Sequence, residues 1–132
     1  MKEQNKILKY INDYLKITSG LDRLFFFTLI FMLLTHIATC LWIVVAAMNA
    51  KGNSSETNMM EGTWLEPWYD VYGDDENGIY AISFYWCITT ITTVGYGDIS
   101  ATNTTEMWFC SLMMVIGVVS FSFANGTLTS II

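Results

Sequence analysis

Residues 93–98 read Thr-Val-Gly-Tyr-Gly-Asp and could coordinate a cation through main-chain oxygens. Backbone carbonyls are uncharged and closely spaced, so a ring of them can replace the hydration shell of a cation that loses its water. Successive carbonyls face one axis only if the backbone alternates in handedness. Gly95 and Gly97 tolerate the positive φ that this alternation requires, whereas a residue with a Cβ would be strained there. The pattern therefore predicts a loop that binds dehydrated cations.

The residues beside the glycines would support such a loop. We expect Val94 and Tyr96 to point away from the axis and to hold the loop open. The hydroxyl of Thr93 would lie beneath the innermost carbonyls. A closed ring needs four copies of the loop, so a single chain cannot form the site.

A short apolar segment directly precedes the loop. Residues 79–92 are hydrophobic but fewer than the roughly 20 that are needed to cross a bilayer. We expect a re-entrant helix, because non-helical backbone at membrane depth must be buried in protein or line a wet cavity. The carbonyl end of this helix, at residues 90–92, carries a partial negative charge that would favour a cation.

Two longer apolar segments flank the short one. Of the 132 residues, 53% are hydrophobic and 14% are charged, and no Asp, Glu, Lys or Arg occurs in 24–50 or 107–132. Each segment exceeds the roughly 20 residues that span a membrane. A signal peptide is excluded for the first, which is longer than an apolar core of about 7–15 residues and begins too late. The sequence predicts an integral membrane protein with two spans.

The charged residues are distributed unequally about the first span. The bases that precede it are Lys2, Lys6, Lys9, Lys16 and Arg23, whereas the segment between the spans holds one base, Lys51, and many acids. Because positive residues stay on the cytoplasmic side, we expect the N-terminus inside and the central segment outside. The net charge of −6 is thus a property of the outer face, and no nucleic-acid partner is expected.

The first 20 residues carry apolar side chains at helical spacing between the bases, which predicts an amphipathic helix at the inner membrane surface. Residues 18–20, Thr-Ser-Gly, should break this helix, and Ser19 with Asp22 would start the next one. Such a helix could act as a lever on the rest of the chain or merely as an anchor. The sequence leaves both readings open.

The outer segment, residues 51–78, is polar and acidic. Its aromatic residues at helical spacing fit an interfacial belt, and residues 74–78 predict a solvated acidic loop that concentrates cations. Asn53 and Asn103 are glycosylation acceptors on the expected outer face, whereas the match at Asn125 lies inside a span.

The remaining residues with reactive side chains lie in apolar segments. Cys40, Cys87 and Cys110 are expected to be small core residues, because their odd number and spacing suit neither disulfides nor a metal. His36 is the one ionisable group of the first span, and we favour a hydrogen bond to a neighbouring helix over a role in ion handling.

The loop at 93–98 resembles the potassium-channel signature Thr-Val-Gly-Tyr-Gly-Asp at every position, and the order of the segments resembles that of the potassium-channel pore. The resemblance implies that K+ ions bind to the carbonyls of Thr93, Val94, Gly95 and Tyr96, to the Thr93 hydroxyl, and outermost to the Gly97 carbonyl.

The same resemblance implies a support for this filter, made by Trp86, Thr89, Thr92 and Asp98. Tyr96 would pack against Trp86 of the pore helix, and Asp98 would lie at the outer mouth. Some members of the family carry a glutamate at the position of Thr89. Coupling of an acidic residue to Asp98 is therefore expected to be absent.

In the second span, Gly117 occupies a position where the family often has a hinge glycine. Close helix packing explains a glycine there equally well. A face that includes this region should line the inner cavity and gate, and its members are Gly117, Val118, Phe121, Asn125 and Thr129.

Residues 21–24 and 36–42 resemble the outer helix of six-span channels that carry a C-terminal cyclic-nucleotide-binding domain, including the ether-à-go-go-like ones. The resemblance implies that residues 1–20 link a voltage-sensor-like domain to the pore. The voltage sensor and the cytoplasmic ligand-binding region are then partners missing from this chain, which we expect to be a fragment. A surface membrane, of plasma or ciliary type, is the expected location.

The expected fold is all-α: an outer helix at about 21–50, a turret at 51–78, a pore helix at 79–92, the filter at 93–98 and an inner helix at 105–132. Three further pore subunits would complete a fourfold-symmetric tetramer. The expected function is K+-selective conduction gated at the inner helices. The alternatives are a weakly selective cation pore and a non-conducting structural or regulatory subunit. No arrangement of residues suggests an enzyme.

Overall fold

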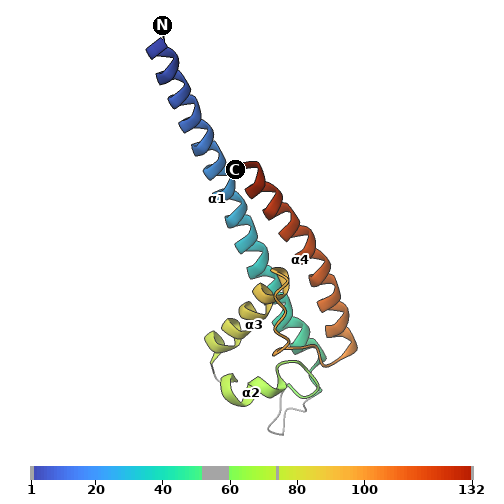
Figure 1. The fold of residues 1–132 in the computed structure, drawn as a ribbon. Helices are drawn as coiled ribbons and strands as arrows, with labels where there is room; N and C mark the ends of the chain where they lie inside the picture. The colour runs from blue at the N-terminus through green and yellow to red at the C-terminus, as the bar shows by residue number, and fades with distance from the viewer. Residues whose placement is uncertain (1, 52–59, 74, 132) are drawn as a thin grey trace.

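The computed structural model describes residues 2–51, 60–73 and 75–131. These residues form the helices α1 (Lys2–Asn49), α2 (Glu66–Tyr72), α3 (Glu76–Ile91) and α4 (Thr104–Ile131), and contain no strand (Figure 1). The all-α fold predicted from the sequence is confirmed. Within this part of the chain, α1 and α4 are each long and apolar enough to cross a membrane. They run side by side in opposite directions, and the short α3 contacts both.

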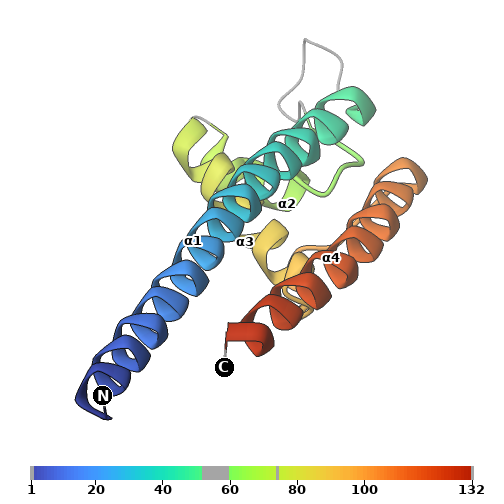
Figure 2. The same ribbon diagram turned by 90° about the horizontal axis from the view of Figure 1, so that it is seen from above.

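The first helix is continuous, so the predicted break at residues 18–20 is wrong. The hydroxyl of Thr18 donates to the carbonyl oxygen of Tyr14 at 2.9 Å, a bond that is compatible with an unbroken helix. Gly20 lowers helix stability by only about 1 kcal/mol relative to alanine, which is too little to end a helix of this length. The first turns of α1 project beyond the C-terminal end of α4 (Figures 1 and 2).

The short helix α3 begins at Glu76, three positions before its predicted start, because Asp75 caps it. The Asp75 carboxylate accepts a hydrogen bond from the backbone N–H of Asn77 at 3.1 Å. The prediction of a solvated acidic loop is therefore wrong for residues 76–78, which form the first turn of α3. Asp74 lies outside the described residues, as does Asn53.

A stack of aromatic rings holds α1, α3, α4 and the segment before α2 together. Trp42 lies at its centre, with ring centroids 4.9 Å from Trp64, 4.1 Å from Trp86 and 5.7 Å from Phe109. All three pairs are nearly parallel, and Trp42 is fully buried. Aromatic side chains bury a large area each, so this stack fixes α3, the start of α4 and the segment before α2 against the C-terminal half of α1.

Small side chains on α1 and α3 allow the helices to approach closely around this stack. Ala38 and Ala46 lie one turn to either side of Trp42 and are buried. Cys87 and Cys110 are also buried, which confirms the prediction for these two cysteines. Cys40 is exposed on the surface of α1, so the prediction that it is a core residue is wrong.

Candidate functional site

The loop that follows α3 has the alternating backbone that its sequence predicts. Gly95 has φ +57° and Gly97 has φ +77°, whereas Val94 and Tyr96 have negative φ. Thr93 also adopts a positive φ, +63°, which was not predicted. Every second residue is thus left-handed. A non-glycine residue in this region costs on the order of 1–3 kcal/mol, and such strain is concentrated at functional sites.

The end of α3 holds the loop in place through its carbonyl and hydroxyl groups. The backbone N–H of Gly95 donates to the carbonyl oxygen of Thr89 at 3.0 Å, so the loop folds back along the helix. The hydroxyl of Thr89 donates to the carbonyl of Trp86 at 2.9 Å, and that of Thr92 to Ile88 at 2.6 Å. Both hydroxyls therefore bond to carbonyls of their own helix, and the role of these threonines in supporting a filter stays a prediction.

The glycines are required by conformation rather than by crowding. A Cβ built on Gly95 or Gly97 would have no neighbour within 4 Å. Their positive φ nevertheless disfavours any residue with a Cβ. The side chains beside them are open as well, with Val94 54% exposed and Tyr96 72% exposed in the single chain.

Tyr85 connects α3 to the outer end of the loop, and the sequence analysis missed it. Its hydroxyl donates to Asp98 Oδ2 at 2.8 Å, and its ring stacks on Tyr96 with centroids 6.4 Å apart. The hydrogen bond to Asp98 raises the pKa of the Tyr85 phenol, because the proton is needed for the bond. A neutral phenol of α3 thus connects this helix to Asp98. The sequence could have indicated this role, because Tyr85 lies one helical turn before Thr89 and thus on the same face of α3.

The predicted contact between Tyr96 and Trp86 is not the one that the chain makes. Trp86 is 5% exposed and stacks on Trp42 of α1. Successive helical residues point about 100° apart, so Tyr85 faces the loop and Trp86 turns toward α1. Trp86 also borders a cavity of about 370 Å³ between the loop, α3 and α4.

A buried carboxylate joins the outer segment to the start of α4. Glu106 is fully buried, and its oxygens accept from the backbone N–H of Trp64 at 3.1 Å and of Thr102 at 2.9 Å. Asn103 Oδ1 accepts in turn from the Glu106 N–H at 2.9 Å, as in a capping box. Although Glu106 belongs to the acidic stretch between the two apolar segments, its side chain is buried and folds back over the start of α4.

Asn103 takes part in the same network, which bears on its predicted glycosylation. Its side-chain amide donates to the carbonyl oxygen of Gly62 at 3.1 Å while its oxygen caps α4. The nitrogen that a glycan would modify is thus held against the Gly62 carbonyl in the folded chain. The folded chain therefore does not present Asn103 as a free acceptor.

Gly117 packs directly against the end of α3. A Cβ added there would lie 2.9 Å from the Ile91 Cα and 3.1 Å from the Ile91 carbonyl oxygen. Of the two readings of this glycine, the geometry supports close packing. The predicted cavity-lining residues beyond it are Val118, Phe121, Asn125 and Thr129, of which Val118 and Phe121 are 55% and 38% exposed in the single chain. Val118 also borders the crevice between α1 and α4.

His36 joins α1 to α3, as the packing interpretation predicts. Its Nδ1 lies 2.6 Å from the Tyr80 hydroxyl, and the two rings are 5.7 Å apart. The bond links two helices on their exposed side, between residues that are 44 positions apart in the chain.

Two membrane-length helices, a short helix between them and a loop with alternating φ define the pore unit of an ion channel. Residues 62–132 match the ion channel family, and the chain belongs to that family.

Among curated proteins, this chain is 30% identical over 103 residues to the potassium channel AKT1 of Arabidopsis thaliana, which covers 74% of this chain and 10% of that protein. It is 28% identical over 116 residues to the potassium voltage-gated channel unc-103 of Caenorhabditis elegans, covering 77% and 13%. It is 29% identical over 113 residues to the voltage-gated delayed rectifier potassium channel KCNH8 of Mus musculus, covering 77% and 10%. The resemblance seen in the sequence is thereby confirmed. No solved structure matches the chain significantly.

Proposed function

We propose that this chain forms the K+-selective conduction path of a tetrameric channel. The observation that carries the proposal is the alternation of positive φ at Thr93, Gly95 and Gly97. An alternating backbone turns successive carbonyls toward one side, and four such loops around an axis would stack rings of oxygens. The potassium channels that match the chain support K+ as the permeant ion.

Dehydrated K+ would be held by the oxygens of the loop. The carbonyls of Thr93, Val94, Gly95 and Tyr96 and the Thr93 hydroxyl would form the main sites, and the Gly97 carbonyl the outermost. The carbonyl end of α3 would add the negative end of its dipole below the filter. No charged side chain touches the ion in this scheme. The ion is therefore bound weakly enough to leave.

The exposure of the loop supports assembly with further copies. Val94 and Tyr96 are large apolar or aromatic residues, yet more than half of each is exposed in one chain. The surfaces of neighbouring subunits would cover them. Since a single chain encloses no axis, conduction requires these partners.

Gating would involve the half of α4 that lies beyond Gly117. Because Gly117 packs on Ile91 of α3, the helix before it is tied to the pore helix. The remainder, with Phe121, Asn125 and Thr129, would move at the inner gate.

Flux measurements on the purified chain in vesicles test the proposal. We expect K+ efflux far above Na+ efflux, and loss of this selectivity in Gly95→Ala, because alanine is strained at a φ of +57°. Gly62→Ala is the matched control: Gly62 has φ +78° but lies before α2, and a Cβ there meets only the Lys51 side chain, at 3.7 Å. Its K+/Na+ ratio should be unchanged.

The other outcomes identify the alternative functions. Equal K+ and Na+ flux through the unaltered chain would indicate a weakly selective cation pore. A folded assembly without flux, and with no effect of Gly95→Ala, would indicate a non-conducting subunit.

A further inference from the structure

Cys40 differs from the other two cysteines of the chain in its exposure and in its partner. It is exposed on the surface of α1, whereas Cys87 and Cys110 are buried. Its Sγ lies 3.9 Å from Nε2 of His36, which is one helical turn earlier on the same face of α1. A thiol becomes a strong nucleophile when a neighbouring base accepts its proton, so the pair has the composition of a reactive site.

Tyr80 of α3 holds the imidazole of His36 in place. Its hydroxyl lies 2.6 Å from Nδ1, and the two rings are 5.7 Å apart. In the tautomer that carries its proton on Nδ1, the imidazole donates to the Tyr80 oxygen, and the lone pair of Nε2 is left for the thiol. A nucleophile, a base beside it and a third group that orients the base form the arrangement found in covalent catalysis, where the contacts are often longer before a reactant binds.

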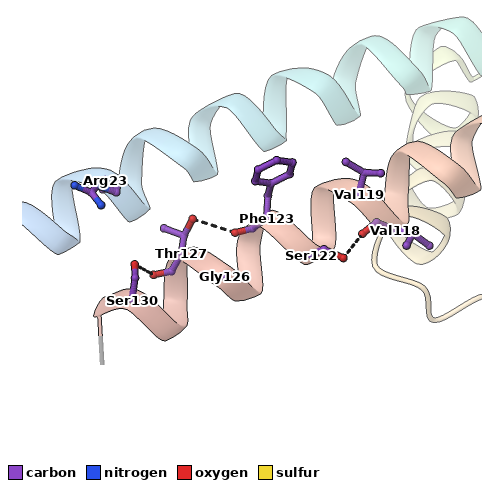
Figure 3. A pocket seen from close by; sticks show the side chains of 8 residues that line it. All are labelled: Arg23, Val118, Val119, Ser122, Phe123, Gly126, Thr127 and Ser130. Atoms are coloured by element: carbon purple, nitrogen blue, oxygen red, sulfur yellow. Dashed lines mark hydrogen bonds between the residues drawn. The ribbon is translucent and has the colours of Figure 1, made fainter.

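The hydroxyl groups in the crevice between α1 and α4 show the contrast. Figure 3 shows Ser122, Thr127 and Ser130 there, each donating to a carbonyl oxygen of its own helix, at 2.7, 3.0 and 2.8 Å. A peptide carbonyl accepts a hydrogen bond but does not take the proton away. These hydroxyls therefore remain unreactive, whereas the thiol of Cys40 has an imidazole as its partner.

The three side chains lie on a face of the molecule that points away from the loop. Tyr80 and Tyr85 are five residues apart on α3, which places them about 140° apart around the helix, and Tyr85 is the one that contacts the loop. The face is exposed in the single chain and would face lipid in the proposed tetramer. Cys40 is ten residues from the end of the charge-free segment at position 50, or about 15 Å along the helix, half the thickness of the hydrocarbon core. A compound that reaches this thiol must dissolve in hydrocarbon.

We propose that Cys40 is a site of covalent modification by lipid-soluble α,β-unsaturated aldehydes, with His36 as the general base and Tyr80 as a positioning residue. The thiol proton passes to His36 Nε2 while the sulfur bonds to the β-carbon of the aldehyde and the electron pair of the C=C bond moves to the α-carbon. His36 then returns the proton to the α-carbon, which leaves a saturated aldehyde joined to the chain by a thioether. A separate thiolate and imidazolium are costly in hydrocarbon, so the base must act during the attack. The modification goes beyond conduction and does not depend on it.

Labelling of the full chain in phosphatidylcholine vesicles tests the proposal. The vesicles are exposed to nonenal, an apolar aldehyde of this class, and the thiol adducts are located by mass spectrometry of peptides. We expect an adduct at Cys40 and none at Cys87 or Cys110, which serve as internal controls because both are buried.

Variants identify the base and the residue that orients it. General bases contribute a factor of about 10²–10⁴, so His36→Gln should lower the rate of labelling at Cys40 at least about tenfold. Tyr80→Phe keeps the ring but removes the hydroxyl, and it should lower the rate by a smaller factor. The matched control is Tyr10→Phe, at an exposed tyrosine near the other end of α1, which should leave the rate unchanged.

Methylmercury separates reactivity from access, because it binds an accessible thiol without the help of a base. It should label Cys40 equally in the unaltered chain, in His36→Gln and in Tyr80→Phe. The proposal is overturned if His36→Gln reacts with nonenal as fast as the unaltered chain, if it loses methylmercury labelling as well, or if a buried cysteine reacts while Cys40 does not. K+ flux, measured on the same vesicles, reports separately on conduction.

Discussion

Replacing Gly117 by alanine separates packing from bending as the reason for this glycine. If Gly117 serves only as a hinge, alanine should stabilise α4, since alanine is favoured over glycine in a helix by roughly 1 kcal/mol. In the structure, however, the new Cβ would lie 2.9 Å from the Ile91 Cα, and backbone cannot move aside as a flexible side chain can. Overpacking of this kind costs about 1–3 kcal/mol.

Gly126→Ala provides the reference within the same helix. A Cβ at Gly126 meets nothing within 4 Å, so this variant gains helix propensity without a clash. Because the gain in propensity is common to both variants, the difference between them isolates the clash. We expect Gly117→Ala to be less stable than Gly126→Ala by about 1–3 kcal/mol.

Unfolding of the purified chain by titration with sodium dodecyl sulfate, followed by tryptophan fluorescence, measures this difference. The Trp42 stack gives a signal that reports on the contact between α1, α3 and α4. Equal stability of the two variants would refute the packing argument. A rise in stability for Gly117→Ala would support the hinge instead.

The remaining predictions concern the outer part of the site. Tyr85→Phe keeps the ring but removes the hydrogen bond that ties Asp98, at the end of the loop, to α3. With this tie lost, we expect the loop to leave its conducting conformation sooner, so that K+ flux decays faster in a time course than in the unaltered chain. Because the pKa of Tyr85 is raised, its hydrogen bond to Asp98 is complete below pH 10 and is lost as the pH rises past the folded-state pKa. The decay rate of K+ flux should therefore rise at such alkaline pH in the unaltered chain. In Tyr85→Phe the decay rate should not change with pH there. Glu106→Gln should destabilise the chain by about 1–3 kcal/mol in the same detergent titration, because an amide group faces N–H donors in a buried site; unaltered stability would show that the network contributes nothing. In an Asn53→Gln variant expressed through a secretory pathway, Asn103 is the outer acceptor that is left. Because its side chain is hydrogen-bonded to Gly62 and Glu106, endoglycosidase treatment should cause no loss of mass, and a loss of mass would contradict that geometry.

Which residues meet across helices could not be predicted from the sequence. Tyr85 and Trp86 are adjacent aromatic residues of one apolar helix, and only the rotation of α3 against its neighbours decides which faces the loop. The burial of Glu106 depends on the backbone of Trp64, more than 40 positions earlier. Local patterns contain no information about such distant partners, so the sequence does not indicate that this acid is buried.

Hydropathy and conformational preference were sufficient for the parts of the protein that depend on local chemistry. The two membrane-length helices follow from runs without charge, the short helix between them from its shorter apolar run, and the alternating loop from the φ freedom of Gly95 and Gly97. The tertiary structure decided that α1 is unbroken, that Gly117 packs on α3 and that Thr93 is left-handed as well. The contact between Gly117 and Ile91 joins segments far apart in the chain, where packing outweighs local propensity. The continuity of α1 and the backbone of Thr93 depend instead on hydrogen bonds to residues a few positions away, which the residue types alone did not indicate.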